Sequence, residues 1–270
     1  MNALPADYHI HSSFSGDSSE KFENITKNAI KKGLTSICIT DHQDFGFYAD
    51  GILFELDKDE YFNYMLYIQD KYKETIDIRI GVETGLEVDK AVRLKEFVNR
   101  HPYDFVIGSS HLINGFDPYY PEYFNGKTER QAFIEYFESI VDNLKVCSDF
   151  DVYGHIDYVV RYAPSKDKNY IYHDYSDILD EILKTIIQKG KGIEVNTSGL
   201  RSGLNNPNPS YDIIRRYREL GGEILTFGSD AHKAQDIAWG FDETVEKVKA
   251  CGFKYYCEFK NRKPEFIALS

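Results

Sequence analysis

The stretch Asp7-Tyr8-His9-Ile10-His11 has the strict polar and apolar alternation of a β-strand. Side chains of a strand point alternately to its two faces, so Tyr8 and Ile10 share one face while His9 and His11 share the other. Two neighbouring imidazoles repel each other when both are protonated, and neutral imidazole is a good ligand for zinc, iron and manganese. A metal site and a hydrogen-bonded polar cluster explain this pair equally well, so the rest of the sequence must decide between them.

The stretch is the first of seven strand-like runs that alternate with helical patterns. The other runs cover residues 35–40, 78–82, 105–110, 151–155, 192–196 and 223–228. Helical spacing of apolar residues marks residues 18–32, 58–74, 89–99, 128–146, 177–189, 210–220 and 242–250. Such alternation predicts right-handed crossovers and a parallel sheet, here closed into a seven-stranded variant of the (β/α) barrel. We expect one domain over residues 1–270.

Several details of the connections follow from single residues. Ser18 or Ser19 is expected to cap the first helix and Gly33 to end it. Residues 114–127, 161–175 and 197–209 are polar or rich in Gly, Pro and Asn, which predicts loops. The residues after 250 are expected to form a short aromatic tail.

The composition excludes several classes of protein. The chain has 270 residues, 42% of them hydrophobic, which is ample for a sizeable core. A net charge of -12 repels nucleic acid and anionic lipid but permits a small phosphorylated substrate. No apolar run approaches the roughly 20 residues of a membrane helix, residues 1–6 do not begin a signal peptide, and the four cysteines stand far apart. We therefore expect a cytoplasmic protein without nucleic-acid or membrane partners.

The carboxyl ends of the strand-like runs are rich in potential metal ligands. In a parallel barrel all of these ends open on the same face. Six of the eight histidines lie there, and only His101 and His173 do not. The residues concerned are His9, His11, His42, Glu83, His111, His155, Glu194, Asn196, Asp230 and His232.

Each of these residues alone is explained by a hydrogen bond or a salt bridge at the rim, and Asp17 alone by a helix cap. Hydrogen bonds and caps do not explain the joint occurrence of these residues at the ends of different strands, because so many histidines and carboxylates would not converge without cations. They also exceed the roughly four to six ligands of one ion, so two or three ions are implied.

The ordered motifs resemble those of the PHP (polymerase and histidinol phosphatase) family. They are H-x-H with Asp17 six residues on, T-D-H, a strand-terminal glutamate, S-S-H, Y-G-H and G-S-D-A-H, and they extend over residues 7–241. Gly154-His155 and the segments 194–200 and 228–237 are most similar to the histidinol-phosphate phosphatases of the family. The resemblance implies a distorted seven-stranded (β/α)7 barrel with three divalent ions (zinc, iron or manganese) at the carboxyl ends of the strands. It also implies hydrolysis of L-histidinol phosphate to L-histidinol and phosphate in histidine biosynthesis.

The resemblance further implies how the ions are held. The first would be bound by His9, His11, Glu83 and Asp230, the second by the bridging Glu83 with His111 and His155, and the third by Asp17, His42 and His232. Glu83, Asp230 and His232 would have catalytic roles, with a hydroxide between the ions attacking phosphorus. We expect Asp7 and Asp41 to orient imidazoles rather than bind metal.

Phosphoryl transfer also calls for positive charge beside the metals, because it depends on positioning and electrostatic stabilisation. Arg161 and Arg201, which follow two of the strands, are the candidates for binding the substrate. The aromatic-rich residues 116–124 are expected to cover the substrate.

Three alternatives stay open. One is another PHP phosphoesterase that acts on a nucleotide or another small phosphate ester. The second is an amidohydrolase-type C–N hydrolase, although that class usually carries a strand-end lysine and this chain has Glu83 in the bridging position. The third is a metal-bearing scaffold without activity.

Overall fold

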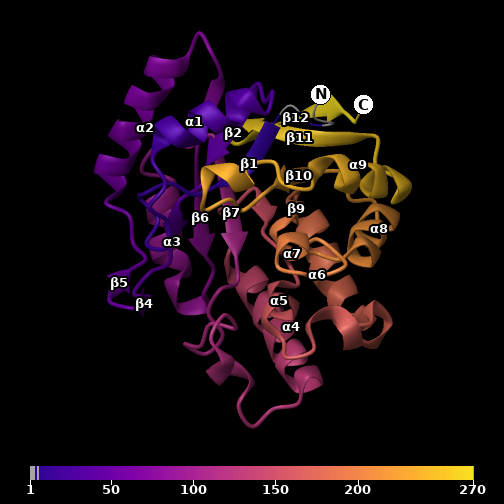
Figure 1. Cartoon of the computed structure of the whole chain (residues 1–270). Helices are drawn as coiled ribbons and strands as arrows, with labels where there is room; N and C mark the ends of the chain where they lie inside the picture. Colours follow the sequence, from indigo (N-terminus) through magenta and orange to yellow (C-terminus); the bar gives the residue numbers. More distant parts are fainter. Residues whose placement is uncertain (1–3, 5, 270) are drawn as a thin grey trace.

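The alternating runs form a nearly closed barrel in the computed structural model, which describes residue 4 and residues 6–269 and contains seven parallel strands in the barrel wall (Figure 1). The strands follow each other in the order β1 (Ala6–Ile10), β2 (Ser36–Ile39), β6 (Asp77–Gly85), β7 (Phe105–Ser109), β8 (Val152–Tyr153), β9 (Gly192–Asn196) and β10 (Leu225–Gly228). The residues after β10 return to β1, where the His11 amide donates to the Ala231 carbonyl at 3.0 Å. The predicted fold class is confirmed.

Helices connect the strands and cover the outside of the barrel. They are α1 (Phe22–Lys31), α2 (Lys58–Tyr72), α3 (Ala91–Val98), α4 (Glu129–Val146), α6 (Ser176–Gln188), α8 (Tyr211–Glu219) and α9 (Phe241–Ala250). Thr128 and Gln131 form a reciprocal capping box at the start of α4. The expected serine cap of α1 is wrong, because the helix begins after Lys21 and the Ser18 hydroxyl instead donates to the His232 carbonyl at 3.1 Å.

The connections at the carboxyl ends of the strands contain short elements. They are β3 (His42–Gln43), β4 (Tyr48–Ala49), β5 (Ile52–Leu53), α5 (Tyr158–Tyr162), α7 (Ser198–Arg201) and the 3-10 helices η1 (Val88–Lys90), η2 (Pro121–Phe124), η3 (Lys166–Asn169), η4 (Tyr172–Tyr175) and η5 (Ala234–Asp236). Arg161 and Arg201 therefore lie on one-turn helices and not in the irregular loops that were predicted. A single turn is too short to produce the apolar periodicity by which a helix is recognised.

The last residues form the hairpin β11 (Tyr255–Lys260) and β12 (Lys263–Ala268), where only an aromatic tail was predicted. The hairpin lies at the amino end of the barrel, near the label of β1 in Figure 1. The Phe259 ring packs on that of Phe105 with centroids 4.9 Å apart, and Arg262 Nε donates to Asp151 Oδ2 at 2.5 Å. The hairpin thus closes the end of the barrel opposite to the predicted site.

The buried apolar residues form one contiguous core cluster. Within the part of the chain that the structure describes, no helix has the length and apolar character needed to cross a membrane. The expectation about a signal peptide concerns residues 1–6, of which residues 1–3 and 5 lie outside the described residues.

Candidate metal centre

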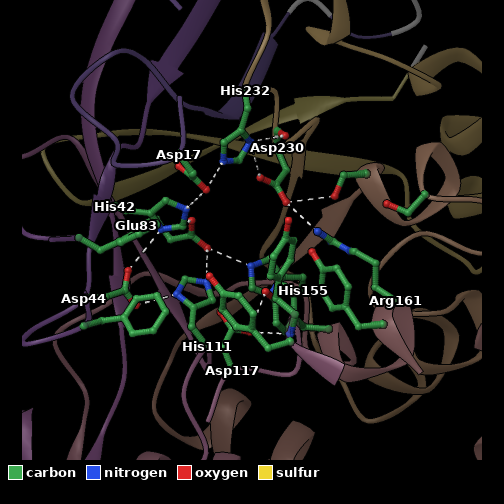
Figure 2. Close-up of a pocket in the computed structure, with 18 of the residues that line it drawn as sticks. Asp17, His42, Asp44, Glu83, His111, Asp117, His155, Arg161, Asp230 and His232 are labelled. Atoms are coloured by element: carbon green, nitrogen blue, oxygen red, sulfur yellow. Dashed lines mark hydrogen bonds and ion pairs between the residues drawn. The ribbon is translucent and has the colours of Figure 1, made fainter. Parts of the chain in front are cut away.

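A pocket of about 360 Å³ opens at the carboxyl ends of the strands, and Glu83 at the end of β6 lies on its inner wall with 1% of its surface exposed. Figure 2 shows His42, His111 and His155 gathered around this carboxylate. Among the described residues, five imidazoles approach it within 3.5 Å. Glu83 Oε2 lies 3.0 Å from His9 Nε2, 3.5 Å from His11 Nε2 and 3.3 Å from His42 Nδ1, while Oε1 lies 3.2 Å from His111 Nε2 and 2.9 Å from His155 Nε2.

Asp17, Asp230 and His232 complete the cluster from other elements. Asp17 Oδ2 lies 3.0 Å from His232 Nε2 and 3.5 Å from His42 Nε2. Asp230 Oδ1 lies 3.4 Å from His11 Nε2. The nine side chains predicted as metal ligands thus converge at one place, and their role as ligands stays a prediction.

Three groups within the cluster have the spacing of a metal site. In each group one potential ligand atom per residue lies within 4.8 Å of all the others. The groups are His11, Asp17, His42 and His232; His9, His11 and Glu83; and His42, Glu83 and His111.

The chemistry of these atoms also fits cations. His11 Nε2 is buried and has no hydrogen-bond partner among the described residues, although two carboxylate oxygens lie within 3.5 Å of it. Burial and the nearby rings of His232 and His42 lower the pKa of His11 to about 3, so this ring is neutral and offers a lone pair. Burial alone would raise the pKa of Glu83, but the positive charges of the protonated His9, His111 and His42 rings hold it well below its usual value, and bound cations would take the place of these protons. Neutral imidazole nitrogens beside ionised carboxylates are the ligands that zinc and similar ions prefer.

Asp41 and Asp7, which were expected to orient imidazoles, have different roles. The Ser15 hydroxyl donates to Asp41 at 2.8 Å and lies 2.9 Å from His11 Nδ1, so Asp41 orients the His11 ring through this serine. The expectation for Asp7 is wrong. Its carboxylate accepts hydrogen bonds from the Ser229 amide and hydroxyl at 3.0 and 2.6 Å and from the Ala238 amide at 2.8 Å, because these donors of the chain after β10 lie beside it.

Two further carboxylates contact the imidazoles. The sequence analysis placed Glu194 among the potential ligands without assigning it to an ion, and it gave Asp44 no role. Asp44 Oδ1 lies 2.7 Å from His111 Nδ1, and Glu194 Oε1 lies 2.5 Å from His9 Nδ1. Glu194 lies at a strand end, as the predicted ligands do, and this position is the feature of the sequence that indicates its place in the site. Asp44 follows His42 by two residues, and nothing in that spacing indicates a contact with His111.

Arg161 and Arg201 both line the pocket. Arg161 is 7% exposed and donates to Asn208 Oδ1 at 3.1 Å, Asp230 Oδ2 at 3.1 Å and Asn196 Oδ1 at 3.3 Å. Arg201 donates from its two η nitrogens to the carbonyls of Ser229 and Asp230, each at 2.9 Å. A guanidinium has five N–H groups, so each arginine keeps donors for a ligand.

The barrel and its rim of imidazoles and carboxylates define a metal-binding (β/α) barrel protein. The chain belongs to the PHP family, because residues 7–198 match the PHP domain and the relatives below match almost the entire chain. The resemblance found in the sequence is confirmed.

The relatives include histidinol-phosphatases. The chain is 33% identical over 258 residues to the histidinol-phosphatase of Lactococcus lactis, with 95% of each chain covered. It is 34% identical over 250 residues to a probable histidinol-phosphatase of Clostridium acetobutylicum, with 92% of this chain and 94% of the relative covered. The crystal structure of the Lactococcus lactis histidinol phosphate phosphatase, complexed with zinc, L-histidinol and phosphate, matches with a TM-score of 0.87 at 32% identity and covers 97% of this chain and 98% of its own.

Proposed function

We propose that the protein is a metal-dependent phosphomonoesterase that hydrolyses L-histidinol phosphate to L-histidinol and phosphate in histidine biosynthesis. The observation that carries the proposal is the convergence of six histidines and three carboxylates on one cluster at a pocket that two arginines also line. The Lactococcus lactis relative, whose structure contains zinc, L-histidinol and phosphate, supports this substrate because the similarity extends over both chains.

The proposed metal centre holds three divalent ions, either zinc, iron or manganese. The sets are His9, His11, Glu83 and Asp230; Glu83, His111 and His155; and Asp17, His42 and His232. The distances around Glu83 and Asp17 support these sets. When bound, such ions make water a stronger nucleophile at neutral pH and neutralise phosphoryl oxygens.

The side chains around the ions have separate tasks in this proposal. Arg161 binds a phosphoryl oxygen with the N–H groups that Asn208, Asp230 and Asn196 leave free, and these three partners fix the plane of its guanidinium. Arg201 binds the phosphoryl group from the side of α7. Glu83, Asp230 and His232 line the pocket and act as catalytic residues.

The outer part of the pocket favours a cationic leaving group. Asp50 and Asp117 line it, and they accept hydrogen bonds from the hydroxyls of Tyr120 at 3.1 Å and Tyr158 at 3.2 Å. Burial raises the pKa of Asp117, which a bound cation would reverse. The amine of histidinol provides such a cation, whereas a mononucleotide does not. Asp117, Tyr119 and Tyr120 come from the segment 116–124 that was expected to cover the substrate.

Phosphate release from a panel of esters tests the function. With zinc, manganese or iron supplied, we expect kcat/KM for L-histidinol phosphate to exceed that for a mononucleotide by at least about tenfold, equivalent to about 1.4 kcal/mol. Asp117→Asn should lower this ratio, and Asp70→Asn on the exposed end of α2 serves as the matched control. Preference for the nucleotide would favour the alternative PHP phosphoesterase, and release of ammonia would favour a C–N hydrolase.

We further propose that residues 1–270 form one PHP phosphoesterase domain, which the single contiguous core supports. A cytoplasmic location is proposed as well. The four cysteines are buried and unpaired, as is usual in a reducing compartment.

A further inference from the structure

We infer that Glu194 is a positioning residue, which joins the His9 ring and the His155 backbone into one unit and thereby holds two of the proposed metal-ligand sets relative to each other. The inference depends on the metal centre proposed above and does not depend on the identity of the substrate.

Among the described residues, the Glu194 carboxylate has three hydrogen-bond partners. Two of them are N–H donors, and His9 Nδ1 donates when it carries the ring hydrogen. Oε1 lies 2.5 Å from His9 Nδ1, while Oε2 accepts from the His155 amide at 3.0 Å and from Asn196 Nδ2 at 3.1 Å. Glu194 is 1% exposed, so water cannot readily replace a lost partner. Only a carboxylate offers two acceptor oxygens here, because the amide of glutamine would turn its NH₂ toward one or two of these donors.

The contact with His9 decides which ring nitrogen is available to a metal. When Nδ1 carries the hydrogen that is donated to Glu194, Nε2 presents its lone pair toward Glu83 Oε2 at 3.0 Å and Asp230 Oδ1 at 3.8 Å. A carboxylate on the far nitrogen also makes an imidazole a better ligand. Glu194 therefore sets both the tautomer and the orientation of His9.

The contact with His155 acts through the backbone. His155 has φ 20°, a value that residues other than glycine rarely adopt. In this backbone conformation its Nε2 lies 2.9 Å from Glu83 Oε1, which belongs to the proposed second set. The hydrogen bond from the His155 amide to Glu194 stabilises that conformation.

Gly228 in β10 provides the space for this arrangement. A Cβ atom at this position would lie 2.3 Å from Glu194 Oε1 and 2.4 Å from the Cβ of His9. Any larger residue would therefore push Glu194 and His9 apart. This close approach is evidence for the pairing that is independent of the hydrogen bonds.

Glu194→Gln tests the inference through metal retention. We expect the variant to fold and to release its metal at a chelator concentration about 10–100-fold lower than the unsubstituted protein requires. Its kcat should fall, while its KM should stay within about threefold of that of the unsubstituted protein. Glu258→Gln is the matched control, because Glu258 in β11 accepts a hydrogen bond from Tyr256 away from the pocket, and it should retain metal normally. Retention of metal by Glu194→Gln at the original chelator concentration would overturn the inference.

Gly228→Ala should produce the same loss of metal without changing any polar group. The zinc-loaded original protein provides a third measurement if neither variant folds. With ¹⁵N-labelled histidine, long-range ¹H–¹⁵N NMR spectra should show a hydrogen on His9 Nδ1 and zinc on Nε2, and zinc on Nδ1 would overturn the inference. The metal-retention and NMR measurements use no substrate, so failure of histidinol phosphate as substrate would leave their outcome unchanged.

Discussion

Glu83 is the residue on which the proposed centre depends most, because its two oxygens lie within 3.5 Å of five imidazoles in the described structure. Glu83→Gln keeps the size of the side chain and removes its charge. We expect phosphatase activity to fall below detection and the metal content per chain to drop, as measured by mass spectrometry of the purified protein. Glu87→Gln, at a partly buried glutamate of the same connection, is the control. A fully active and fully metallated Glu83→Gln would contradict the bridging role.

Arg161 allows substrate binding to be separated from metal binding. Arg161→Ala removes charged hydrogen bonds worth about 1.5–3 kcal/mol, so we expect KM to rise about 10–100-fold. The metal content should stay intact, since Ser198 Oγ still donates to Asp230 at 3.0 Å. Steady-state kinetics and metal analysis measure the two effects.

Arg262→Ala is the matched control for this variant, because Arg262 makes its ion pair at the opposite end of the barrel. Arg201→Ala is also expected to weaken substrate binding with the metals retained. Since Arg201 donates to the Ser229 and Asp230 carbonyls, loss of metal in either arginine variant would instead indicate a structural role.

Eight of the nine predicted ligands could be found in the sequence because each lies at a strand end or next to one, and strand ends of a parallel barrel meet on one face. Asp17 lies in the connection between β1 and α1 and was predicted only from the resemblance. With the exception of Asp41, the residues that orient the ligands could not be found in this way. Glu194 and His9 are 185 positions apart, and Asp44 and His111 are 67 apart. No local spacing encodes such pairs, because they arise only when the barrel closes.

At the scale of elements, the hairpin β11–β12 should affect stability and not catalysis. Phe259 is 2% exposed and packs on Phe105, so Phe259→Ala should lower the free energy of unfolding by about 3–5 kcal/mol. The metal content and KM should not change, since the site lies at the other end of the barrel. Urea denaturation measures the effect.

Phe266→Ala in the same hairpin is the matched control. Phe266 is 49% exposed, and its replacement should change the free energy of unfolding by no more than about 0.5 kcal/mol. Equal effects of the two substitutions would show that the hairpin does not close the barrel as described.

Long periodic elements were predicted well, whereas short ones were not. The apolar stripe of α4 gave both ends of the helix within one residue. The one-turn helices α5 and α7 are too short to show a helical periodicity of apolar residues. The strands β11 and β12 alternate only partly between buried and exposed residues. The Ser18 cap failed because the helix begins only after Lys21, and the Ser18 oxygen accepts from the Glu20 amide at 3.2 Å before the helix starts.

At the scale of the whole molecule, removal of metal should destabilise the protein. Without cations the buried carboxylates and imidazoles of the centre depend only on one another. Free zinc at about 100 times its Kd should stabilise the folded state by about 2.7 kcal/mol, which corresponds to a rise in Tm of roughly 5–10 °C. A thermal melt of chelated protein with and without added zinc measures this shift. Glu83→Gln should show a smaller rise, and an unchanged Tm in the original protein would contradict the metal centre.

The pairing of β1 with residues near the other end of the chain has a consequence for the folding of the chain during its synthesis. The Tyr8 hydroxyl donates to the Phe259 carbonyl, 251 positions away, and His11 pairs with Ala231. Translation at about 5–20 residues per second leaves the open side of β1 without its partner for roughly 10–50 s on the ribosome. During that interval the nascent barrel presents a strand with one unpaired backbone edge, so the yield of folded protein in a cell should respond to the supply of chaperones that bind such strands.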